Sequence, residues 1–162
     1  AEAAVTVETV KKALKEKPPV EVTYTDLDFP KNITDVQVID NANKPGQKNI
    51  MIYYKSGAVW NETDMVRRAG GTAIEICSIL YANPKVEDVA IFAQTEMTDQ
   101  YGHTSLENGV KIVITRDIAN KANWKGLAER HTTDPGNIYR ISGNYYIHPG
   151  ILKNVDLEKI RL

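Results

Sequence analysis

The sequence predicts an α+β fold: an antiparallel sheet of about five strands, with a long central helix and a shorter second helix packed on one face. Three observations support this prediction. Residues 62–82 carry an apolar stripe at helical spacing. Other segments alternate apolar and polar residues with the period of two that is typical of half-buried strands. Strands both precede and follow the helix, so one sheet with helices on a single face is the simplest arrangement.

The length and composition are those of one domain covering residues 1–162. Of the 162 residues, 42% are hydrophobic and 25% are charged, which is enough for a substantial core. The 20 basic and 21 acidic residues give a net charge of −1, so there is no overall attraction for nucleic acid. No apolar run reaches the length of a membrane-spanning helix. We therefore expect neither a nucleic-acid partner nor a transmembrane segment in this chain.

The first part of the chain predicts a short helix and then three strands. In residues 5–16, Thr6 is a suitable N-cap and lysines gather near the C-terminal end, where the helix dipole favours them. Pro18 and Pro19 end this helix. Alternating residues separated by turns then predict an antiparallel meander of three strands, over residues 20–25, 35–40 and 49–55.

The long central helix, residues 62–82, has clear limits. Asn61 is a good N-cap, and Asn83-Pro84 ends the helix. Its buried stripe is predicted to comprise Val66, Ala69, Ala73, Ile76 and Leu80. The opposite side is predicted to face water and comprises Asp64, Arg68, Gly71, Glu75 and Ser78. Glycine is costly in a helix interior, so Gly70-Gly71 indicates close approach of another backbone, for packing or for binding, or else a local kink.

The second half begins with two strands joined by a turn. Residues 88–97 and 109–116 alternate in the strand pattern, and Gly102 lies in the polar segment between them. This pattern predicts an antiparallel hairpin with a fairly long loop. A shorter helix over residues 118–130, interrupted near Asn123, follows the hairpin. Residues 137–162 contain many turn formers, aromatic and β-branched residues, and we expect short strands and ordered loops there.

Two motifs around the hairpin carry a resemblance to known domains. The turn Thr98-Asp99-Gln100-Tyr101-Gly102 is followed about twenty residues later by Ala119-Asn120-Lys121-Ala122-Asn123-Trp124. With Trp60, Met65 and the 112–114 strand, this part of the chain resembles uncharacterised domains of bacterial and archaeal secreted proteins and lipoproteins. The resemblance covers roughly a third of the chain. It implies an extracytoplasmic location, secreted or anchored to the cell envelope through a removed N-terminal segment, and no reaction; a cytoplasmic location is the alternative.

The start of the chain and two sequons leave further alternatives open. Ala1 is compatible with a removed leader, with excision of Met, or with a chosen boundary. Asn32 and Asn61 begin glycosylation sequons, which matter only if the chain is exported by a host that modifies them.

The inventory of reactive side chains is small. The single cysteine, Cys77, lies between apolar neighbours in the central helix, which favours a buried hydrophobe over a nucleophile. His103 has Glu96, Asp99 and Glu107 near it in sequence, so this loop is either a carboxylate–histidine ion site or a solvated turn. His131 and His148 stand in no metal-binding motif.

Other motifs of cofactor or metal chemistry do not appear in the sequence. The pair Asp26 and Asp28 lacks the remaining ligands of a calcium loop, and we interpret it as a strand end. No glycine-rich phosphate motif and no nucleophile-elbow motif is present. We expect no metal and no cofactor.

Two functional hypotheses follow. The first is a non-catalytic binding domain for a protein, a glycan or a small molecule. Its binding surface would be an exposed sheet face or would include the candidate residues Asp99, Tyr101, His103, Tyr139, Tyr145 and Tyr146. The second is a hydrolase-type enzyme whose site forms only in three dimensions around carboxylates and one histidine, His103, His131 or His148. For Tyr101, a scaffold role in which its ring folds back over the hairpin is the alternative to recognition.

Overall fold

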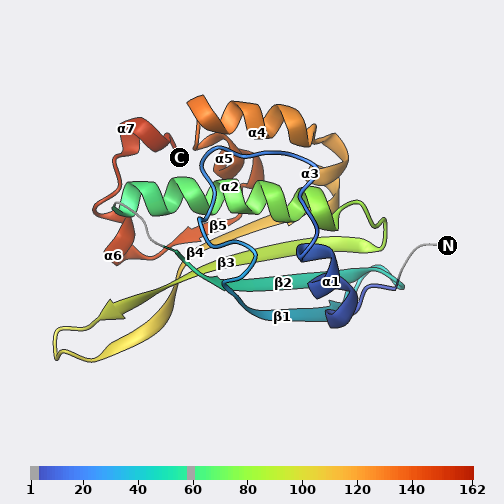
Figure 1. Ribbon diagram of the computed structural model, residues 1–162, viewed down its shortest axis with the longest axis horizontal. Helices are drawn as coiled ribbons and strands as arrows, with labels where there is room; N and C mark the ends of the chain where they lie inside the picture. Colours follow the sequence, from blue (N-terminus) through green and yellow to red (C-terminus); the bar gives the residue numbers. More distant parts are fainter. Residues whose placement is uncertain (1–3, 58–60) are drawn as a thin grey trace.

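The sheet has five strands in the order β1-β2-β3-β4-β5. The computed structural model describes residues 4–57 and 61–162 (Figure 1). Neighbouring strands are antiparallel except β2 and β3, which are parallel. The α+β prediction is therefore confirmed, and the sheet is mixed but mostly antiparallel. The strands are β1 (Ile33–Asp40), β2 (Lys48–Lys55), β3 (Val86–Thr98), β4 (Thr104–Thr115) and β5 (Tyr145–Ile147).

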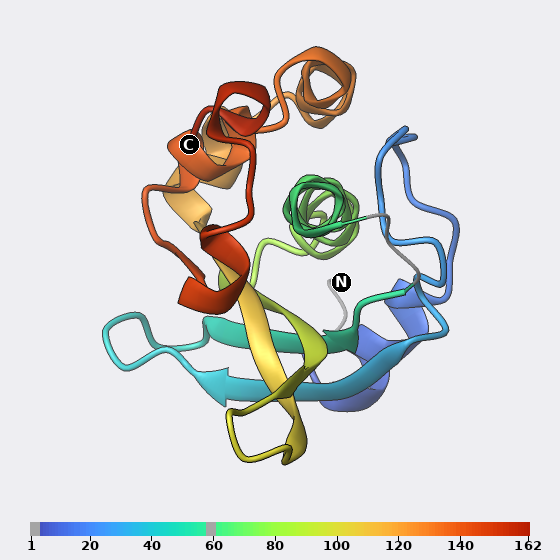
Figure 2. The ribbon, with the colours of Figure 1, turned by 90° about the vertical axis from the view of Figure 1, so that its left-hand side faces the viewer.

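The longest helix, α2, lies across one face of the sheet, and α4 lies farther out, beyond α2 (Figure 2). Both α4 and α5 pack against α2, and α1 packs against α2 and β1. The second long helix therefore covers α2 rather than the sheet. In the part of the chain that the structure describes, no helix has the length and apolar character needed to cross a membrane. The helices are α1 (Val7–Leu14), α2 (Glu62–Leu80), α3 (Arg116–Lys121), α4 (Trp124–Thr133), α5 (Asn137–Ser142), α6 (Pro149–Leu152) and α7 (Leu157–Ile160).

The parallel pairing of β2 and β3 corrects the prediction of an entirely antiparallel sheet. The chain leaves β2, runs back along α2 and enters β3 in the direction of β2, with Tyr53 opposite Phe92. A helical crossover of this kind joins parallel strands, whereas a tight turn joins antiparallel ones. The position of α2 between two adjacent strands therefore determines this pairing.

The predicted strand over residues 20–25 is wrong, and β5 is the fifth strand instead. Residues 20–28, which we call the strap, cross α2 without regular structure. The backbone groups of the strap bond to side chains rather than to a neighbouring strand. Thr72 Oγ1 accepts from the Asp26 amide at 2.9 Å, and Arg68 Nη1 donates to the Thr25 carbonyl at 2.8 Å. These side-chain partners take the place of a neighbouring strand at Thr25 and Asp26.

α2 begins and ends close to its predicted limits, and its predicted apolar stripe is buried. Asn61 Oδ1 accepts from the Asp64 amide at 2.9 Å, which confirms the N-cap. The prediction of a water-facing side is wrong, because Asp64 and Glu75 are only 2% and 7% exposed. Arg67 and Arg68 pair with the Asp64 carboxylate at 2.5 and 2.9 Å, which offsets the cost of burying its charge.

The two glycines of α2 allow other parts of the chain to approach closely. A Cβ on Gly71 would lie 1.9 Å from the carbonyl oxygen of Tyr24, in the strap. A Cβ on Gly70 would lie 2.9 Å from Ile138 Cγ2, in α5. Close approach of another backbone, one of the two alternatives, is therefore found at Gly71, while Gly70 packs against side chains.

The C-terminal half is more helical than predicted. The expected helix over residues 118–130 is divided into α3 and α4, because Ala122 is extended and Asn123 caps α4. Within residues 137–162 only β5 is a strand, and the rest is largely the short helices α5, α6 and α7. The N-terminal helix, predicted over residues 5–16, spans α1 with Thr6 as its N-cap. Ala1 and Trp60, which entered the sequence argument, lie outside the described residues.

Candidate binding surface

The β3–β4 hairpin extends beyond the rest of the sheet (Figure 1). β2 pairs with β3 only as far as Gln94, and β5 pairs with β4 only from Val110. Between these points β3 and β4 pair with each other alone, and we call this segment, residues 95–108, the arm. Every residue from 98 to 108 is exposed. The arm is therefore a two-stranded ribbon that reaches into solvent.

The tip of the arm is a short, hydrogen-bonded turn. The strands pair up to Thr98 and Thr104, so the loop is shorter than predicted. Asp99 Oδ1 accepts from the backbone amides of Tyr101 at 2.8 Å and His103 at 3.0 Å. Gly102 has φ +84°, a conformation that other residues rarely adopt. Asp99 thus shapes the turn, while Tyr101 is 78% exposed and does not fold back over the hairpin.

The base of the arm is packed against α2 and α6. A Cβ on Gly150 would lie 2.8 Å from Met97 Cε, and one on Gly109 would lie 2.7 Å from Ile151 Cδ1. These side chains therefore fill the space beside the two glycines. A hollow of about 340 Å³ lies at this junction, lined by Met65, Thr95, Glu96 and Met97 together with residues at the start of α2 and in α6.

The three candidate tyrosines near the C-terminus have different environments. Tyr139 is 0% exposed, and its Oη donates to the Val66 carbonyl at 2.5 Å. It is a core residue that a ligand cannot reach, and burial raises the pKa of its hydroxyl well above the ordinary value. Its ring meets that of Tyr145 edge-on, with centroids 5.2 Å apart. Tyr145 and Tyr146 are 37% and 46% exposed.

The structure does not bring the tyrosines of β5 to the arm tip. Tyr146 lies opposite Lys111 on β4. Lys111 is seven residues from Thr104, and a strand rises about 3.4 Å per residue. The backbone beside Tyr146 is therefore roughly 24 Å from the arm tip. The tip residues Asp99, Tyr101 and His103 therefore form one candidate surface, and Tyr146 belongs to another.

The three histidines occupy separate places. His131 is 1% exposed, its Nε2 lies 3.1 Å from the Tyr24 carbonyl, and burial lowers its pKa to about 4. His148 caps α6 by accepting from the Gly150 amide at 2.9 Å. His103 stands on the exposed tip. Across residues 4–57 and 61–162, no three side chains of His, Cys, Asp or Glu come together in a group that could hold a metal ion.

Besides Asp64, α2 buries the ionisable groups of Cys77 and Glu75. Cys77 is 0% exposed, and burial raises the pKa of its thiol far above the ordinary range, so the thiolate is scarce at neutral pH. This environment agrees with the structural role that was predicted. Burial also raises the pKa of Glu75 to about 7, although Thr25 Oγ1 donates to its carboxylate at 3.0 Å. Sequence reasoning missed Glu75, because it placed this residue on a water-facing side.

Asp26 corrects the interpretation of the Asp26–Asp28 pair as a strand end. Its carboxylate is 3% exposed and accepts from the Gly57 amide at 2.7 Å, the Asn32 amide nitrogen at 2.8 Å and the Asp28 amide at 3.0 Å. Asp26 thus ties the strap to the start of β1 and to the segment after β2. The side-chain amides of both sequon residues, Asn32 and Asn61, have internal hydrogen bonds of this structural kind.

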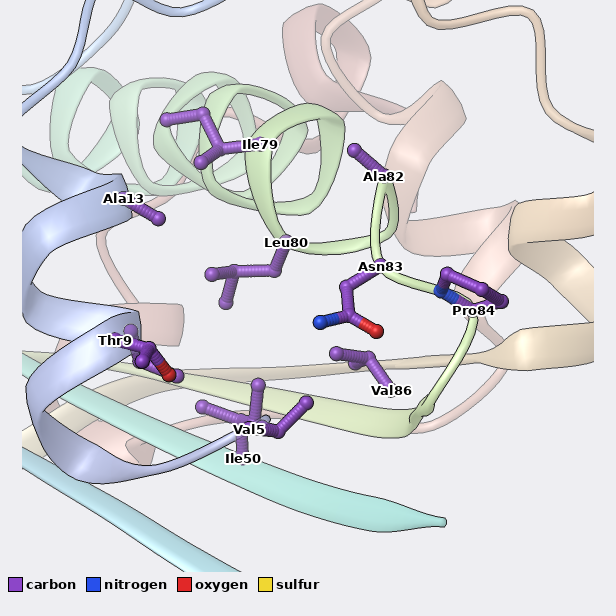
Figure 3. Close-up of a pocket in the computed structure, with 11 residues that line it drawn as sticks. Val5, Thr9, Ala13, Ile50, Ile79, Leu80, Ala82, Asn83, Pro84 and Val86 are labelled. Atoms are coloured by element: carbon purple, nitrogen blue, oxygen red, sulfur yellow. The ribbon is translucent and has the colours of Figure 1, made fainter. Parts of the chain in front are cut away.

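An apolar pocket of about 300 Å³ lies between α1 and the C-terminal end of α2. Leu80 points into this space from α2, and Thr9 faces it from α1 (Figure 3). Asn83 also lines the pocket, and its Oδ1 accepts from the Lys85 amide at 3.0 Å. The volume is at the lower limit for ligand sites, and the lining contains no charged side chain that would select a ligand.

The sheet face opposite α2 carries partly exposed apolar and aromatic side chains, and we call it the open face. The rings of Tyr53 and Phe92 stack there with centroids 4.4 Å apart and an interplanar angle of 12°. Lys111 Nζ lies 5.4 Å from the centroid of the Phe92 ring. The signal in the sequence is a continuous apolar run in each central strand, such as residues 50–54 and 89–93, where a half-buried strand would alternate.

Comparisons with known proteins assign no family. The chain matches no protein-family model, no curated protein and no solved structure. The side chains described above are therefore the basis for inferring function.

Proposed function

We propose that this chain is a non-catalytic protein-binding domain, with the tip of the arm as its recognition element. The observation that carries this proposal is the 78% exposure of Tyr101 on a turn that Asp99 and Gly102 hold in one conformation. A tyrosine ring offers a large contact area and a hydrogen-bonding hydroxyl, and it loses little conformational entropy on binding. A fixed turn also lowers the ordering cost of association.

The shape of the arm favours a protein over a small molecule as the partner. Small ligands bind in concave sites that enclose most of their surface. The tip is a convex projection whose residues are all exposed, so it fits a groove on a larger molecule. Packing of Met97 against Gly150 supports the arm at its base. The partner would contact Tyr101 without contacting the helical layer.

The alternative of a hydrolase-type enzyme lacks a supporting arrangement in the described residues. A general base must reach a reacting group, alone or through one water. His131 is buried against the strap and His148 caps a helix. The carboxylate of Asp99, next to His103, accepts hydrogen bonds from the turn itself. Each histidine thus has a structural role or stands alone on the tip.

Site-specific photo-crosslinking tests the proposal. Tyr101 is replaced by p-benzoylphenylalanine, with Leu152 on α6, 39% exposed, replaced in the same way as the matched control. In cells of the source organism, we expect a discrete protein adduct from position 101 and none from position 152. Excess wild-type domain should suppress the adduct, and excess Tyr101→Ala domain should not. No adduct, or equal suppression by both competitors, would contradict the proposal.

We also propose the extracytoplasmic location that the sequence resemblance implies. Fractionation of the same cells tests it, because the native protein should be recovered with the envelope or the medium. Recovery with the cytoplasm would contradict this location while leaving the crosslinking result intact.

A further inference from the structure

The three central strands are apolar toward both faces of the sheet. Inward-facing residues of β2, β3 and β4, such as Ile52, Ile91 and Ile112, are at most 2% exposed beneath the helices. The residues between them face the other way and are also largely apolar: Met51, Tyr53, Ala90, Phe92 and Val113. Strands that are apolar in both directions are typical of sheets covered on both faces.

The open face is not covered by the described chain. All five of those outward side chains remain partly exposed, whereas their inward neighbours are buried. α2 and α4 lie on the opposite side of the sheet (Figure 2). A partly exposed apolar patch of this kind, with the charged residues Asp35 and Lys111 on the strands beside it, is typical of a protein interaction surface.

One row of the open face is complementary to itself. Asp35, Tyr53, Phe92 and Lys111 lie directly opposite one another on β1 to β4, and the row ends at Tyr146 on β5, opposite Lys111. Over β1 to β4 the row therefore runs acid, aromatic, aromatic, base. With strands about 4.8 Å apart, the acid and the base are roughly 14 Å from each other. Asp35 is exposed, and within the described residues its carboxylate accepts from its near neighbours in β1, Val36 and Gln37.

Two copies can pack with their open faces together, related by a two-fold axis that runs parallel to the strands between β2 and β3. Each row of one copy then lies over the same row of the other copy, which runs in the opposite order. Asp35 of one copy then faces Lys111 of the other, and this ion pair occurs twice. The stacked rings of Tyr53 and Phe92 face the same pair in the other copy. In the next row Met51 lies opposite Ala90 of the other copy, a large side chain against a small one. The strands of the two copies remain aligned, as face-to-face sheets require.

We propose that this chain forms a two-fold symmetric dimer through the open face, with a second copy of itself as the occupant. Charge complementarity along the Asp35–Lys111 row sets the register, and the central apolar residues supply the buried area. The arm lies outside this surface, so a dimer would present two arms. This inference is independent of the recognition role proposed for Tyr101.

Charge reversal tests the dimer by sedimentation equilibrium at low ionic strength over a series of protein concentrations. We expect wild type to dimerise, and Asp35→Lys alone or Lys111→Asp alone to weaken dimerisation at least tenfold (about 1.4 kcal/mol). The double variant restores opposite charges in both pairs and should regain wild-type association. Glu129→Lys, which makes the same charge change at an exposed site on α4, should leave association unchanged.

The possible outcomes show whether the open face binds a second copy of this chain or a different protein. Thermal melting first checks that each variant is folded. A wild-type chain that stays monomeric at all concentrations would overturn the proposal, and a different protein would then have to cover the open face. Dimerisation that both single variants retain, or that the double variant fails to restore, would also overturn it. Recovery in the double variant supports this pairing specifically, because a general effect of surface charge would not be reciprocal.

Discussion

α2 and the arm are opposite extremes of this molecule. α2 is buried on nearly all sides, by the sheet below it and by the strap, α4 and α5 around it. The arm is exposed on all sides between residues 98 and 108. Both are regular, hydrogen-bonded elements, yet their neighbours differ completely. Substitutions in α2 should therefore change stability, whereas substitution of the exposed Tyr101 ring at the arm tip should change recognition alone.

The largest effect is expected where α2 approaches the strap. Gly71→Ala places a Cβ 1.9 Å from the Tyr24 carbonyl oxygen, so the strap must move. Overpacking costs about 1–3 kcal/mol, and each strap hydrogen bond that is lost adds about 1 kcal/mol. We expect the free energy of unfolding to fall by about 4 kcal/mol in urea titrations.

A second glycine provides the matched control for that experiment. Gly126 lies in α4, and a Cβ there would be 3.4 Å from its nearest neighbour, Asn123 Cγ. Gly126→Ala should therefore raise stability by about 0.5 kcal/mol, as alanine does at open helix positions. Equal effects of the two substitutions would show that the strap does not hold its position against α2.

The next effect concerns the side of α2 that faces the sheet. Leu80 is 4% exposed, and Leu80→Ala should cost about 2–3 kcal/mol, in the lower part of the range for buried leucines. The reason is that Leu80 borders the apolar pocket beside α1, so the space left by its side chain opens into an existing hollow. Leu157→Ala, at a residue 56% exposed, should change the urea midpoint very little. An unchanged midpoint for Leu80→Ala would place the buried stripe elsewhere.

A smaller, pH-dependent effect is expected at Glu75. Its pKa is about 7 in the folded protein and about 4.3 in an unfolded chain. The folded state holds the proton more tightly, so this contribution to stability is fully present below about pH 4 and is lost as the pH rises through about 7. Glu75→Gln cannot ionise and should gain about 1–2 kcal/mol over wild type between about pH 4 and pH 8. The full pKa shift of Glu75 would correspond to a larger gain in stability, but solvent in the adjoining hollow screens the charge of its carboxylate.

The pH experiment measures the difference in free energy of unfolding between Glu75→Gln and wild type at each pH. Groups that titrate in the same way in both proteins do not contribute to this difference. His131 has a pKa of about 4, below its unfolded value, because it is buried. It stabilises the fold above about pH 6.5, and that stability is lost as the pH falls toward 4. This opposite contribution is present in both proteins and cancels in the difference. A stability difference that stays constant with pH would place Glu75 in water.

Features set by adjacent residues could be predicted from the sequence. Asn61 caps α2 through the amide of Asp64, three residues away, and Gly102 forms the hairpin turn through its own backbone. The strap could not be predicted, because Thr72, the partner of Asp26, is distant in sequence. Val20, Val22 and Tyr24 have the period of a strand, but only tertiary contacts decide whether a strand partner exists.

The candidate site residues also divide into those whose environment follows from the local sequence and those whose environment depends on distant contacts. Tyr101 is exposed because of the local turn, so its presentation was predictable. Tyr139 was expected on the same binding surface, but it contacts the Val66 carbonyl across 73 positions of the chain, which places it in the core. The burial of Glu75 likewise depends on the distant Thr25. Contacts between remote segments therefore account for the errors in the site as well as in the fold.

The smallest effect on stability is expected at the arm tip, and it sharpens the comparison with α2 most directly. Tyr101 is 78% exposed, so Tyr101→Ala removes almost no buried area and should change the free energy of unfolding by less than about 0.5 kcal/mol. Asp99→Ala is the matched variant, because it removes the acceptor of two turn hydrogen bonds and should cost about 1–2 kcal/mol. Urea unfolding measures both variants, and competition for the crosslinked partner measures recognition. We expect Tyr101→Ala to lose competition at unchanged stability, and Asp99→Ala to lose both because the ring is no longer held in place. If Tyr101→Ala instead destabilised the fold and its folded fraction still competed fully, the ring would be part of the scaffold and the exposed Tyr146 would become the next candidate.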